Sequence, residues 1–349
     1  MMLFLVSCKR DKTEDDTYIS SVETSKNIAE NEGNKERYTI GWSVNEASRE
    51  FYKSIQDGVL AKAEELGIDV IPHDERGSTA EMITGAINLI EQGIDALVIA
   101  PVTPEAMGIV SDAAREAGIP IVVLDTGYNG ADIDAFIVSD SFGGGVLAGE
   151  YALELIADHN LTSKNVAIIT VEEKFIYARR RGEGFRNVML DAGYDVVAQL
   201  PGNSNPIDGY LAMKKILSQS GDDLAVVFAE NDRMALGAVQ AINEAGKKGE
   251  IMVIGFDAEP SAIQAIKEGL MQGTIAQESF EMGELGVETA NTLLTGGIVA
   301  YDDRVNKELY VEVYLIDETG EPRQVEVPRE ESKSSQKEGP PQKNQIIPI

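Results

Sequence analysis

From Tyr38 onward, short apolar runs alternate with amphipathic stretches of about 10 to 15 residues, and this alternation restricts the possible folds more than any other feature of the sequence. In the first amphipathic stretch, Ile55, Val59 and Ala63 recur at helical spacing. Short apolar strands that alternate with helices are typical of parallel sheets covered by helices on both faces. The runs that we interpret as strands are YTIGWSV, IDVIP, DALVIA, PIVVLD and FIVSD, followed by NVAIIT, YDVVAQL, LAVVFA and IMVIGFD.

The predicted strands fall into two groups, because the alternation begins again at the helical stretch GGGVLAGEYALELIA. At 349 residues, of which 43% are hydrophobic, the chain is long enough for two ordinary domains with sizeable cores. We therefore predict an α/β fold with two doubly wound parallel-sheet lobes rather than one very wide sheet.

The two ends of the sequence lack this pattern. Residues 9–36 and 328–349 are charged or polar and contain few large apolar residues. Such a composition cannot bury enough surface to offset the entropy of ordering the chain. We predict a flexible tether over 9–36 and a disordered tail over 328–349.

A short apolar start precedes the predicted tether. The run Leu5-Val6-Ser7-Cys8 resembles the lipobox of bacterial lipoproteins, in which the cysteine is lipidated after cleavage. Because the apolar run is shorter than that of a complete export signal, we interpret residues 1–8 as a truncated lipoprotein signal with Cys8 as the lipidation site. The alternative is an apolar start with a free thiol. No stretch approaches the roughly 20 apolar residues of a spanning helix, so we expect membrane contact through a lipid anchor only.

Charge and residue usage argue against several classes of function. The sequence has 30 basic and 59 acidic residues, a formal net charge of −29, which repels nucleic-acid phosphates. There is one cysteine, and the two histidines, His73 and His159, have no companion at ligand spacing, so we predict no metal site and no cofactor. The sequence contains neither a GxSxG motif nor a P-loop, and we expect a protein that is not an enzyme.

Polar residues follow the ends of several predicted strands. Asp125 follows PIVVL, Asn231 follows AVVFAE, Asp257 follows IMVIGF and Gln277 follows GTIA. Ligands of open parallel sheets bind beyond the carboxyl ends of the strands, so these residues are candidate ligand contacts. Helix capping and turn formation are the alternative roles, because Asn and Asp are favoured at both.

The same residues lie in runs that resemble the type I periplasmic sugar-binding proteins, most closely the ribose-binding branch. The resemblance spans residues 37–316 in a constant order. It implies two lobes joined by a three-segment hinge. The matching runs are Phe51-Tyr52, Asp57-Gly58, Leu124-Asp125, Arg179-Arg180-Arg181-Gly182-Glu183-Gly184-Phe185, VFAENDRMALGA, Gly255-Phe256-Asp257 and TIAQ ending at Gln277.

The resemblance also implies how the chain is divided. Lobe one is expected at 37–138 and 277–306, and lobe two at 139–276 and 307–320. The chain would then cross between the lobes near Ser139, Gln277 and Asn306.

In this family a sugar lies between two lobes that close around it. An aromatic ring can pack on the C–H face of a sugar, while carboxylates, amides and arginine hydrogen-bond its hydroxyls. By matching position, the implied ligand contacts are Phe51 and Tyr52 on the sugar ring and Asp125, Arg179, Asn231, Asp257 and Gln277 on its hydroxyls, with Arg49, Thr126 and Phe256 as further possible contacts.

Several positions depart from the ribose-binding pattern. Ala100, Thr126 and Ser204 stand where that pattern has an asparagine, an arginine and an aromatic residue. The departures argue against ribose itself and favour another sugar or a sugar-like polyol. Within the run of three arginines, Arg179 and Arg180 are alternative registers, and we assign Arg179. Replacement contacts are available at Arg49, Tyr128, Tyr177 and Asn205.

The resemblance implies an extracytoplasmic solute-binding protein that delivers a small sugar or polyol to an ABC transporter permease. Presentation of the sugar to a chemoreceptor or sensor kinase is the alternative that the sequence leaves open. Lactose-repressor-like regulators share the two-lobed core, but the segment before Tyr38 has neither the two helices nor the basic face of a DNA-binding headpiece. We therefore expect no nucleic-acid partner.

Overall fold

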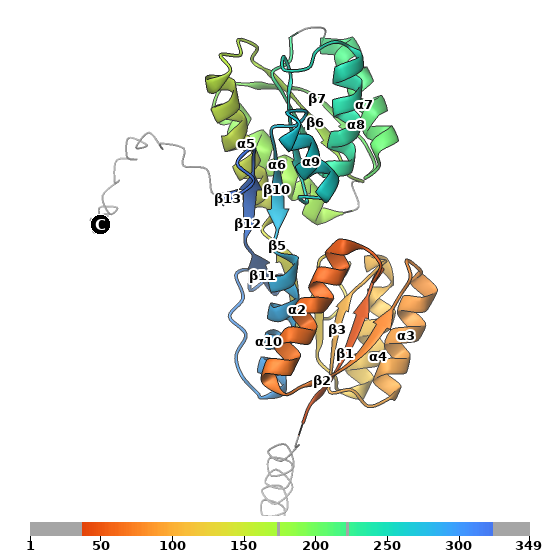
Figure 1. Ribbon diagram of the computed structural model, residues 1–349. Coiled ribbons are helices and arrows are strands. Elements are labelled where there is room, and N and C mark those ends of the chain that lie inside the picture. The colour runs from red at the N-terminus through yellow and green to blue at the C-terminus, as the bar shows by residue number, and fades with distance from the viewer. Residues whose placement is uncertain (1–36, 173–174, 221–222, 324–349) are drawn as a thin grey trace, which may run out of the picture. The chain divides into compact units, whose positions relative to one another are not determined.

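The computed structural model describes residues 37–172, 175–220 and 223–323 (Figure 1). The predictions made for the lipoprotein signal with Cys8, the tether over 9–36 and the tail over 328–349 lie outside these residues. In the described part of the chain, no helix is long and apolar enough to cross a membrane.

Two compact units make up the described chain. Lobe one contains the described residues of 37–140 and 278–312, and lobe two those of 141–277 and 313–323. The chain passes from one unit to the other after Asp140, Gln277 and Glu312.

Lobe one is built on a six-stranded parallel sheet in the order β11-β5-β4-β3-β1-β2. Helices α2 and α10 cover one face and α3 and α4 the other (Figure 1). Its strands are β1 (Thr39–Val44), β2 (Asp69–Asp74), β3 (Ala96–Ala100), β4 (Ile121–Leu124), β5 (Ala135–Ser139) and β11 (Glu308–Val311), and its helices are η1 (Pro104–Ala106), α2 (Glu50–Leu66), α3 (Thr79–Glu91), α4 (Met107–Ala117) and α10 (Ser279–Leu294).

Lobe two has a seven-stranded sheet in the order β13-β12-β10-β9-β8-β6-β7. Five strands are parallel, whereas β12 is antiparallel to β10 and β13 is antiparallel to β12. The predicted α/β fold with two doubly wound sheets is thus confirmed. The strands are β6 (Asn165–Thr170), β7 (Asp195–Pro201), β8 (Val226–Ala229), β9 (Met252–Phe256), β10 (Gly273–Gln277), β12 (Val313–Ile316) and β13 (Pro322–Arg323), and the helices are α5 (Ser141–Asp158), α6 (Ile176–Asp191), α7 (Pro206–Ser220), α8 (Asp232–Glu244) and α9 (Pro260–Lys267).

The third passage between the lobes differs from the one predicted near Asn306. Strand β11 pairs in parallel with β5, from Glu308 opposite Phe136 to Val311 opposite Ser139, so it belongs to lobe one and not to lobe two. The stretch from Leu309 to Ile316 lies in the segment 307–320 that was predicted for lobe two, but it forms two strands that join different sheets. The register of backbone pairing, which the apolar pattern does not encode, decides this division.

The first five strands of each lobe have the same spatial order. Counted along the chain within each lobe, that order is fifth, fourth, third, first, second in both sheets. Strand β4 of lobe one therefore corresponds to β9 of lobe two, and β5 corresponds to β10.

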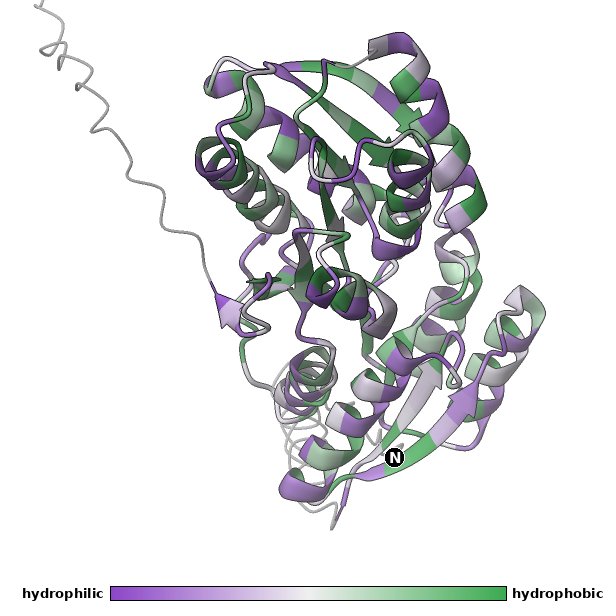
Figure 2. Ribbon diagram, turned by 45° about the horizontal axis from the view of Figure 1, so that its top comes forward, coloured by the Kyte–Doolittle hydropathy of each residue, from purple (hydrophilic) through white to green (hydrophobic). Residues whose placement is uncertain are grey.

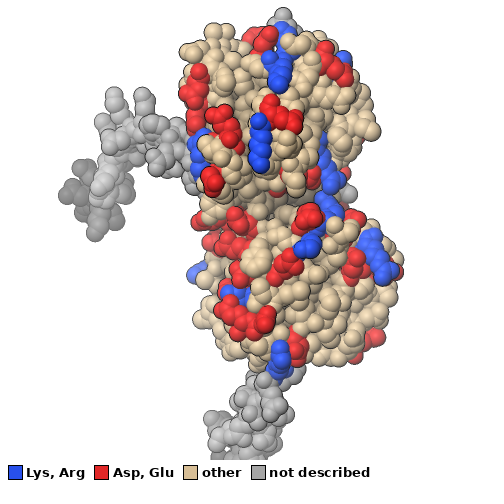
Figure 3. Space-filling view, viewed as in Figure 1, with Lys and Arg blue, Asp and Glu red and all other residues tan. Residues whose placement is uncertain are grey.

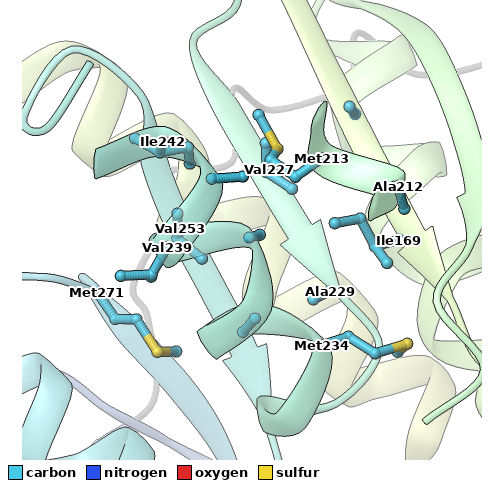
Figure 4. Close-up of a cluster of buried hydrophobic side chains, with 14 of the residues drawn as sticks. Ile169, Ala212, Met213, Val227, Ala229, Met234, Val239, Ile242, Val253 and Met271 are labelled. Carbon is cyan, nitrogen blue, oxygen red and sulfur yellow. The ribbon is translucent and has the colours of Figure 1, made fainter. Parts of the chain in front are cut away.

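Each sheet buries apolar side chains against its helices. Figure 2 shows hydrophobic residues along one side of many helices and hydrophilic residues along the other. In lobe two, Ile169 of β6, Val227 of β8 and Val253 of β9 pack in one cluster with Met213 of α7 and Ile242 of α8 (Figure 4). In lobe one the cluster around β1 includes Trp42, the single tryptophan of the sequence, which is fully buried.

Glycines allow two pairs of helices to pack with their backbones in close approach. A Cβ added to Gly58 of α2 would lie 2.0 Å from the carbonyl oxygen of Phe280 in α10. A Cβ added to Gly184 of α6 would lie 2.3 Å from the carbonyl oxygen of Phe142 in α5. Because backbone atoms block both positions, the helices must separate if a side chain is introduced.

Substitution Gly58→Ala is expected to destabilise lobe one by about 1–3 kcal/mol, the usual cost of overpacking. Urea unfolding followed by Trp42 fluorescence measures this, since Trp42 lies in the same lobe. The control is Gly108→Ala in α4, where an added Cβ meets no atom within 4 Å. The control should leave stability unchanged or raise it slightly, because alanine is the better helix former. Equal effects at both positions would contradict the packing argument.

Candidate functional site

In lobe one, the predicted site residues gather around Asp125. This residue directly follows β4, and its amide donates to the carbonyl oxygen of Ile137 in β5 at 2.9 Å. The Tyr52 hydroxyl donates to Asp125 Oδ2 at 3.1 Å, and Asn45 Nδ2 donates to the same hydroxyl at 3.1 Å. The loop after β1 and the loop after β4 are thereby joined at the carboxyl ends of their strands.

The two aromatic residues predicted to stack on a ligand have different environments. Tyr52 is only 3% exposed and is held by its bonds to Asp125 and Asn45, whereas Phe51 is partly buried. Their ring centroids lie 5.4 Å apart in an edge-on arrangement. Arg49 is exposed, with its guanidinium carbon 5.3 Å from the centre of the Tyr52 ring. Of these residues, Phe51 and Arg49 are accessible to solvent, and the buried Tyr52 ring packs against both of them.

The hydroxyl of Thr126 is used within lobe one. It donates to the carbonyl oxygen of Pro101 at 2.5 Å and so ties the loop after β4 to the end of β3. Ala100, where the ribose-binding pattern has an asparagine, is fully buried at the end of β3.

In lobe two, Asp257 is the centre of a hydrogen-bonded cluster. It directly follows β9, and its amide donates to the carbonyl oxygen of Ile275 in β10 at 2.8 Å. Arg181 Nη1 donates to Asp257 Oδ1 at 3.1 Å, and Gln277 Nε2 donates to the same oxygen at 2.7 Å. The structure thus brings two of the predicted site residues, Asp257 and Gln277, into direct contact.

Arg181, and not Arg179, belongs to this cluster. The Arg181 side chain is 3% exposed, and Nη1 also donates to the carbonyl oxygen of Glu230 at 2.7 Å. Arg179 is exposed on α6. Residues two positions apart in a helix project about 200° apart around its axis, so Arg179 and Arg181 face opposite sides of α6. The assignment of Arg179 is therefore not supported by the structure. Within the run of three arginines, the residue predicted from the sequence lies two positions before the one that faces inward.

Aromatic rings flank the Arg181 guanidinium. Its central carbon lies 3.7 Å from the ring centre of Phe256 and 5.2 Å from that of Tyr177. Phe256 is fully buried, so it supports the guanidinium and does not offer its own surface to a ligand. Tyr177 is partly buried.

Asn231 is the N-cap residue of α8. Its Oδ1 accepts a hydrogen bond from the amide of Met234 at 3.1 Å, and the residue is 8% exposed. The capping role that competed with ligand binding is therefore present in the structure. It uses the carbonyl oxygen of the side chain and leaves the amide group as a donor.

The candidates Tyr128 and Asn205, and Ser204 at a position that departs from the ribose-binding pattern, take part in local hydrogen bonds. The Ser204 hydroxyl donates to Glu172 Oε2 at 3.1 Å, the Asn205 amide donates to Asp208 Oδ2 at 2.9 Å, and the Tyr128 hydroxyl donates to the carbonyl oxygen of Asn306 at 3.0 Å. These contacts order the loops that carry them.

Sequence reasoning overlooked two buried glutamates that join the strand ends. Glu75, after β2, accepts from the Ser43 hydroxyl and from the amide of Val102, both at 2.8 Å. Glu230, after β8, accepts from the amide of Val171 at 2.7 Å. Burial raises the pKa of each carboxyl to about 7. For Glu230, a charged residue directly after the apolar strand β8 was the available signal.

Asp232 is a third buried acid near the lobe-two cluster. Its carboxylate accepts from the Thr274 hydroxyl and from the amide of Glu259, both at 2.7 Å. Complete burial, with the charge of Asp257 nearby, raises the pKa of Asp232 well above its ordinary value.

The described residues contain no cluster of metal ligands, and one face of the molecule carries mixed charges. Within 37–172, 175–220 and 223–323, no group of three or more His, Cys, Asp or Glu side chains is placed to hold a metal ion. On the face shown in Figure 3, basic side chains lie among acidic ones and form no basic patch.

A family model described as the periplasmic binding protein domain matches residues 40–298. The chain belongs to this family. The periplasmic binding protein is 34% identical over 266 residues to a ribose import binding protein of Bacillus subtilis, covering 76% of this chain and 85% of the relative. It is 32% identical over 295 residues to the corresponding protein of Escherichia coli, covering 84% and 97%.

Solved structures of the family resemble this periplasmic binding protein as well. A periplasmic ribose ABC transporter protein of Conexibacter woesei has a TM-score of 0.74 and 26% identity, covering 82% of this chain and 94% of that one. A solute-binding protein of Bacillus halodurans with bound myo-inositol has a TM-score of 0.68 and 26% identity, covering 82% and 96%.

Replacing Glu75 by glutamine should flatten the pH dependence of lobe-one stability. The folded pKa of Glu75 is raised from 4.5 to about 7, so its stabilising contribution is complete below about pH 4.5 and is lost as the pH rises through about 7. Between about pH 5 and 8 the wild-type protein should lose about 2–3 kcal/mol more than Glu75→Gln. Urea unfolding followed by Trp42 fluorescence measures the difference. The exposed substitution Glu64→Gln is the control, and wild-type behaviour in Glu75→Gln would refute the expectation.

Proposed function

We propose that this periplasmic binding protein captures a small sugar or polyol outside the cytoplasm, delivers it to an ABC transporter permease and acts by binding without catalysis. The observation that carries the proposal is the cluster of Asp257, Arg181 and Gln277 at the carboxyl ends of β9 and β10. Parallel sheets of this kind bind ligands at that edge. The relatives support the class of ligand, since they include ribose import binding proteins and solute-binding proteins with bound myo-inositol and D-allose.

The chemistry of these side chains suits a ring rich in hydroxyl groups. Each hydroxyl both donates and accepts, and the two lobes offer carboxylates, amides and a guanidinium for this purpose. Charge-assisted hydrogen bonds are about twice as strong as neutral ones. In this proposal the ligand-binding groups of lobe one are Phe51 and Asp125, and those of lobe two are Arg181, Asn231, Asp257 and Gln277.

Supporting residues surround the proposed contacts. Tyr52 holds Asp125, Phe256 holds Arg181, and Thr126 holds the loop that carries Asp125. The absence of an asparagine at Ala100, of an arginine at Thr126 and of an aromatic residue at Ser204 favours a ligand other than ribose.

The proposal predicts that wild-type protein binds at least one of D-ribose, D-allose, L-arabinose, myo-inositol and xylitol. A ligand at one hundred times its dissociation constant stabilises the native state by about 2.7 kcal/mol, which a thermal-shift screen detects. Substitution Arg181→Ala should then weaken binding of that ligand by about tenfold or more in calorimetry, because a buried ligand hydroxyl loses its charge-assisted partner. If no sugar or polyol shifts the melt but an amino acid or nucleotide does, the proposed ligand class is wrong.

Two comparisons make this prediction specific. Arg179→Ala removes an equal charge from the exposed side of the same helix and should leave affinity within about twofold. Asn231→Ser keeps the N-cap but removes the amide donor, so a loss of affinity without a loss of stability identifies the amide as a ligand contact. Melting temperatures without ligand separate binding from folding. Equal affinities of Arg181→Ala and Arg179→Ala would remove Arg181 from the site.

We also propose that Cys8 carries a lipid anchor that holds the protein at the outer face of the cell membrane. The supporting observation is the run Leu5-Val6-Ser7-Cys8 followed by a charged segment. Expressed in a bacterium behind a complete signal peptide, the protein should incorporate labelled fatty acid, and Cys8→Ala should abolish the label. Ser7→Ala, which keeps a small residue before the cysteine, should still be labelled. Label that persists in Cys8→Ala would refute the anchor.

A further inference from the structure

The helix pairs α2–α10 and α5–α6 repeat one packing arrangement in the two lobes. Gly58 of α2 packs against the carbonyl of Phe280, and Gly184 of α6 packs against the carbonyl of Phe142. These phenylalanines lie at equivalent places, because each is the second residue of its helix. The contacts therefore place Gly58 and Gly184 at corresponding positions.

The reciprocal contacts confirm this correspondence. A Cβ on Gly283 of α10 would lie 2.0 Å from the carbonyl oxygen of Ile55, and a Cβ on Gly145 of α5 would lie 2.0 Å from that of Arg181. Ile55 and Arg181 each stand three residues before the glycine of their own helix. The two lobes can thus be compared residue by residue along α2 and α6.

This register makes Tyr177 the counterpart of Phe51. Both stand seven residues before the packing glycine, and each is the second residue of its helix. Both helices also follow the first strand of their sheet. Phe51 is the lobe-one aromatic that the proposed function assigns to the ligand.

The surroundings of Tyr177 fit the same use. Its ring centre lies 5.2 Å from the Arg181 guanidinium carbon and 5.7 Å from the ring centre of Phe175. Arg181 in turn donates to Asp257. A partly buried aromatic ring therefore lies directly beside the polar cluster of lobe two, as an apolar wall next to groups that bind hydroxyls.

We propose that Tyr177 is the aromatic face of the ligand-binding groups in lobe two and that it packs on the C–H face of a cyclic sugar or cyclitol. This inference rests on the proposed function. A rigid ring presents its C–H groups as one apolar surface, which suits an aromatic wall, whereas its hydroxyls point outward to the polar groups. The residue thereby selects ligands that are closed rings.

The test uses full-length protein with D-allose, myo-inositol and D-ribose as probes. Tyr177→Ala should weaken each cyclic probe that binds by about threefold to tenfold, the range expected for loss of an aromatic contact. Tyr177→Phe keeps the ring and should stay within about twofold, as should the control Ile176→Ala at the exposed neighbouring position. Melting without ligand checks that each variant folds.

A second measurement separates ligand contact from support of Arg181. In deuterated protein with protonated tyrosines, magnetisation transferred from tyrosine rings to the C–H protons of the probe should decrease in Tyr177→Phe. Unchanged transfer, or unchanged affinity in Tyr177→Ala, overturns the role of Tyr177 while sugar binding by the wild type still supports the proposed function. A wild-type protein that binds none of the cyclic probes overturns both.

Discussion

The burial of one guanidinium determines how lobe two is arranged. A charged group that is 3% exposed must have its charge and its donors satisfied, because an unpaired buried charge is strongly destabilising. Arg181 meets most of this demand with the Asp257 carboxylate, the Glu230 carbonyl and the face of Phe256, whereas its Nε–H has no hydrogen-bond partner among the described residues. These partners come from the ends of β8 and β9, so the ion pair fixes where those strand ends lie relative to α6. Glycine at position 182 permits the approach, since a Cβ there would lie 2.4 Å from Glu230 Oε1.

Backbone strain occurs at the matching place in both lobes. Asp125 has a φ of 66° and Asp257 a φ of 108°, values in the left-handed region that non-glycine residues rarely adopt. Each directly follows the fourth strand of its lobe and donates its amide to the fifth strand. Strain of this kind costs about 1–3 kcal/mol per residue and persists where surrounding contacts hold it. Its repetition at two aspartates suggests that the direction of the carboxylate, rather than a local turn preference, is what the fold preserves.

The sequence predicted the architecture well because apolar periodicity and strand length are local properties. It also identified Asp125, Asp257 and Gln277 at strand ends, where topology alone brings residues to one edge of a sheet. Arg181 was missed because three consecutive arginines give no periodicity from which to choose the inward one. The acid–glycine pairs Asp57-Gly58 and Glu183-Gly184 would have identified it, since they align α2 with α6 and place Arg181 opposite the buried Ile55. The division of the stretch 309–316 between two sheets depended on long-range pairing that a strand pattern does not contain.

The last strands of both sheets come from chain that follows Asn306, and this order has a consequence for synthesis. Strand β5 lacks its neighbour β11 until that strand is translated, roughly 10 to 30 seconds later at about 5–20 residues per second. Strand β10 likewise waits for β12. For β10 the interval is only about 2 to 7 seconds, because β12 begins 36 residues after β10 ends. Until its partner has been made, each of the two strands has an unpaired edge that can pair with other chains. Neither lobe can complete its sheet early, because one short segment, residues 308–323, supplies the last strands of both sheets.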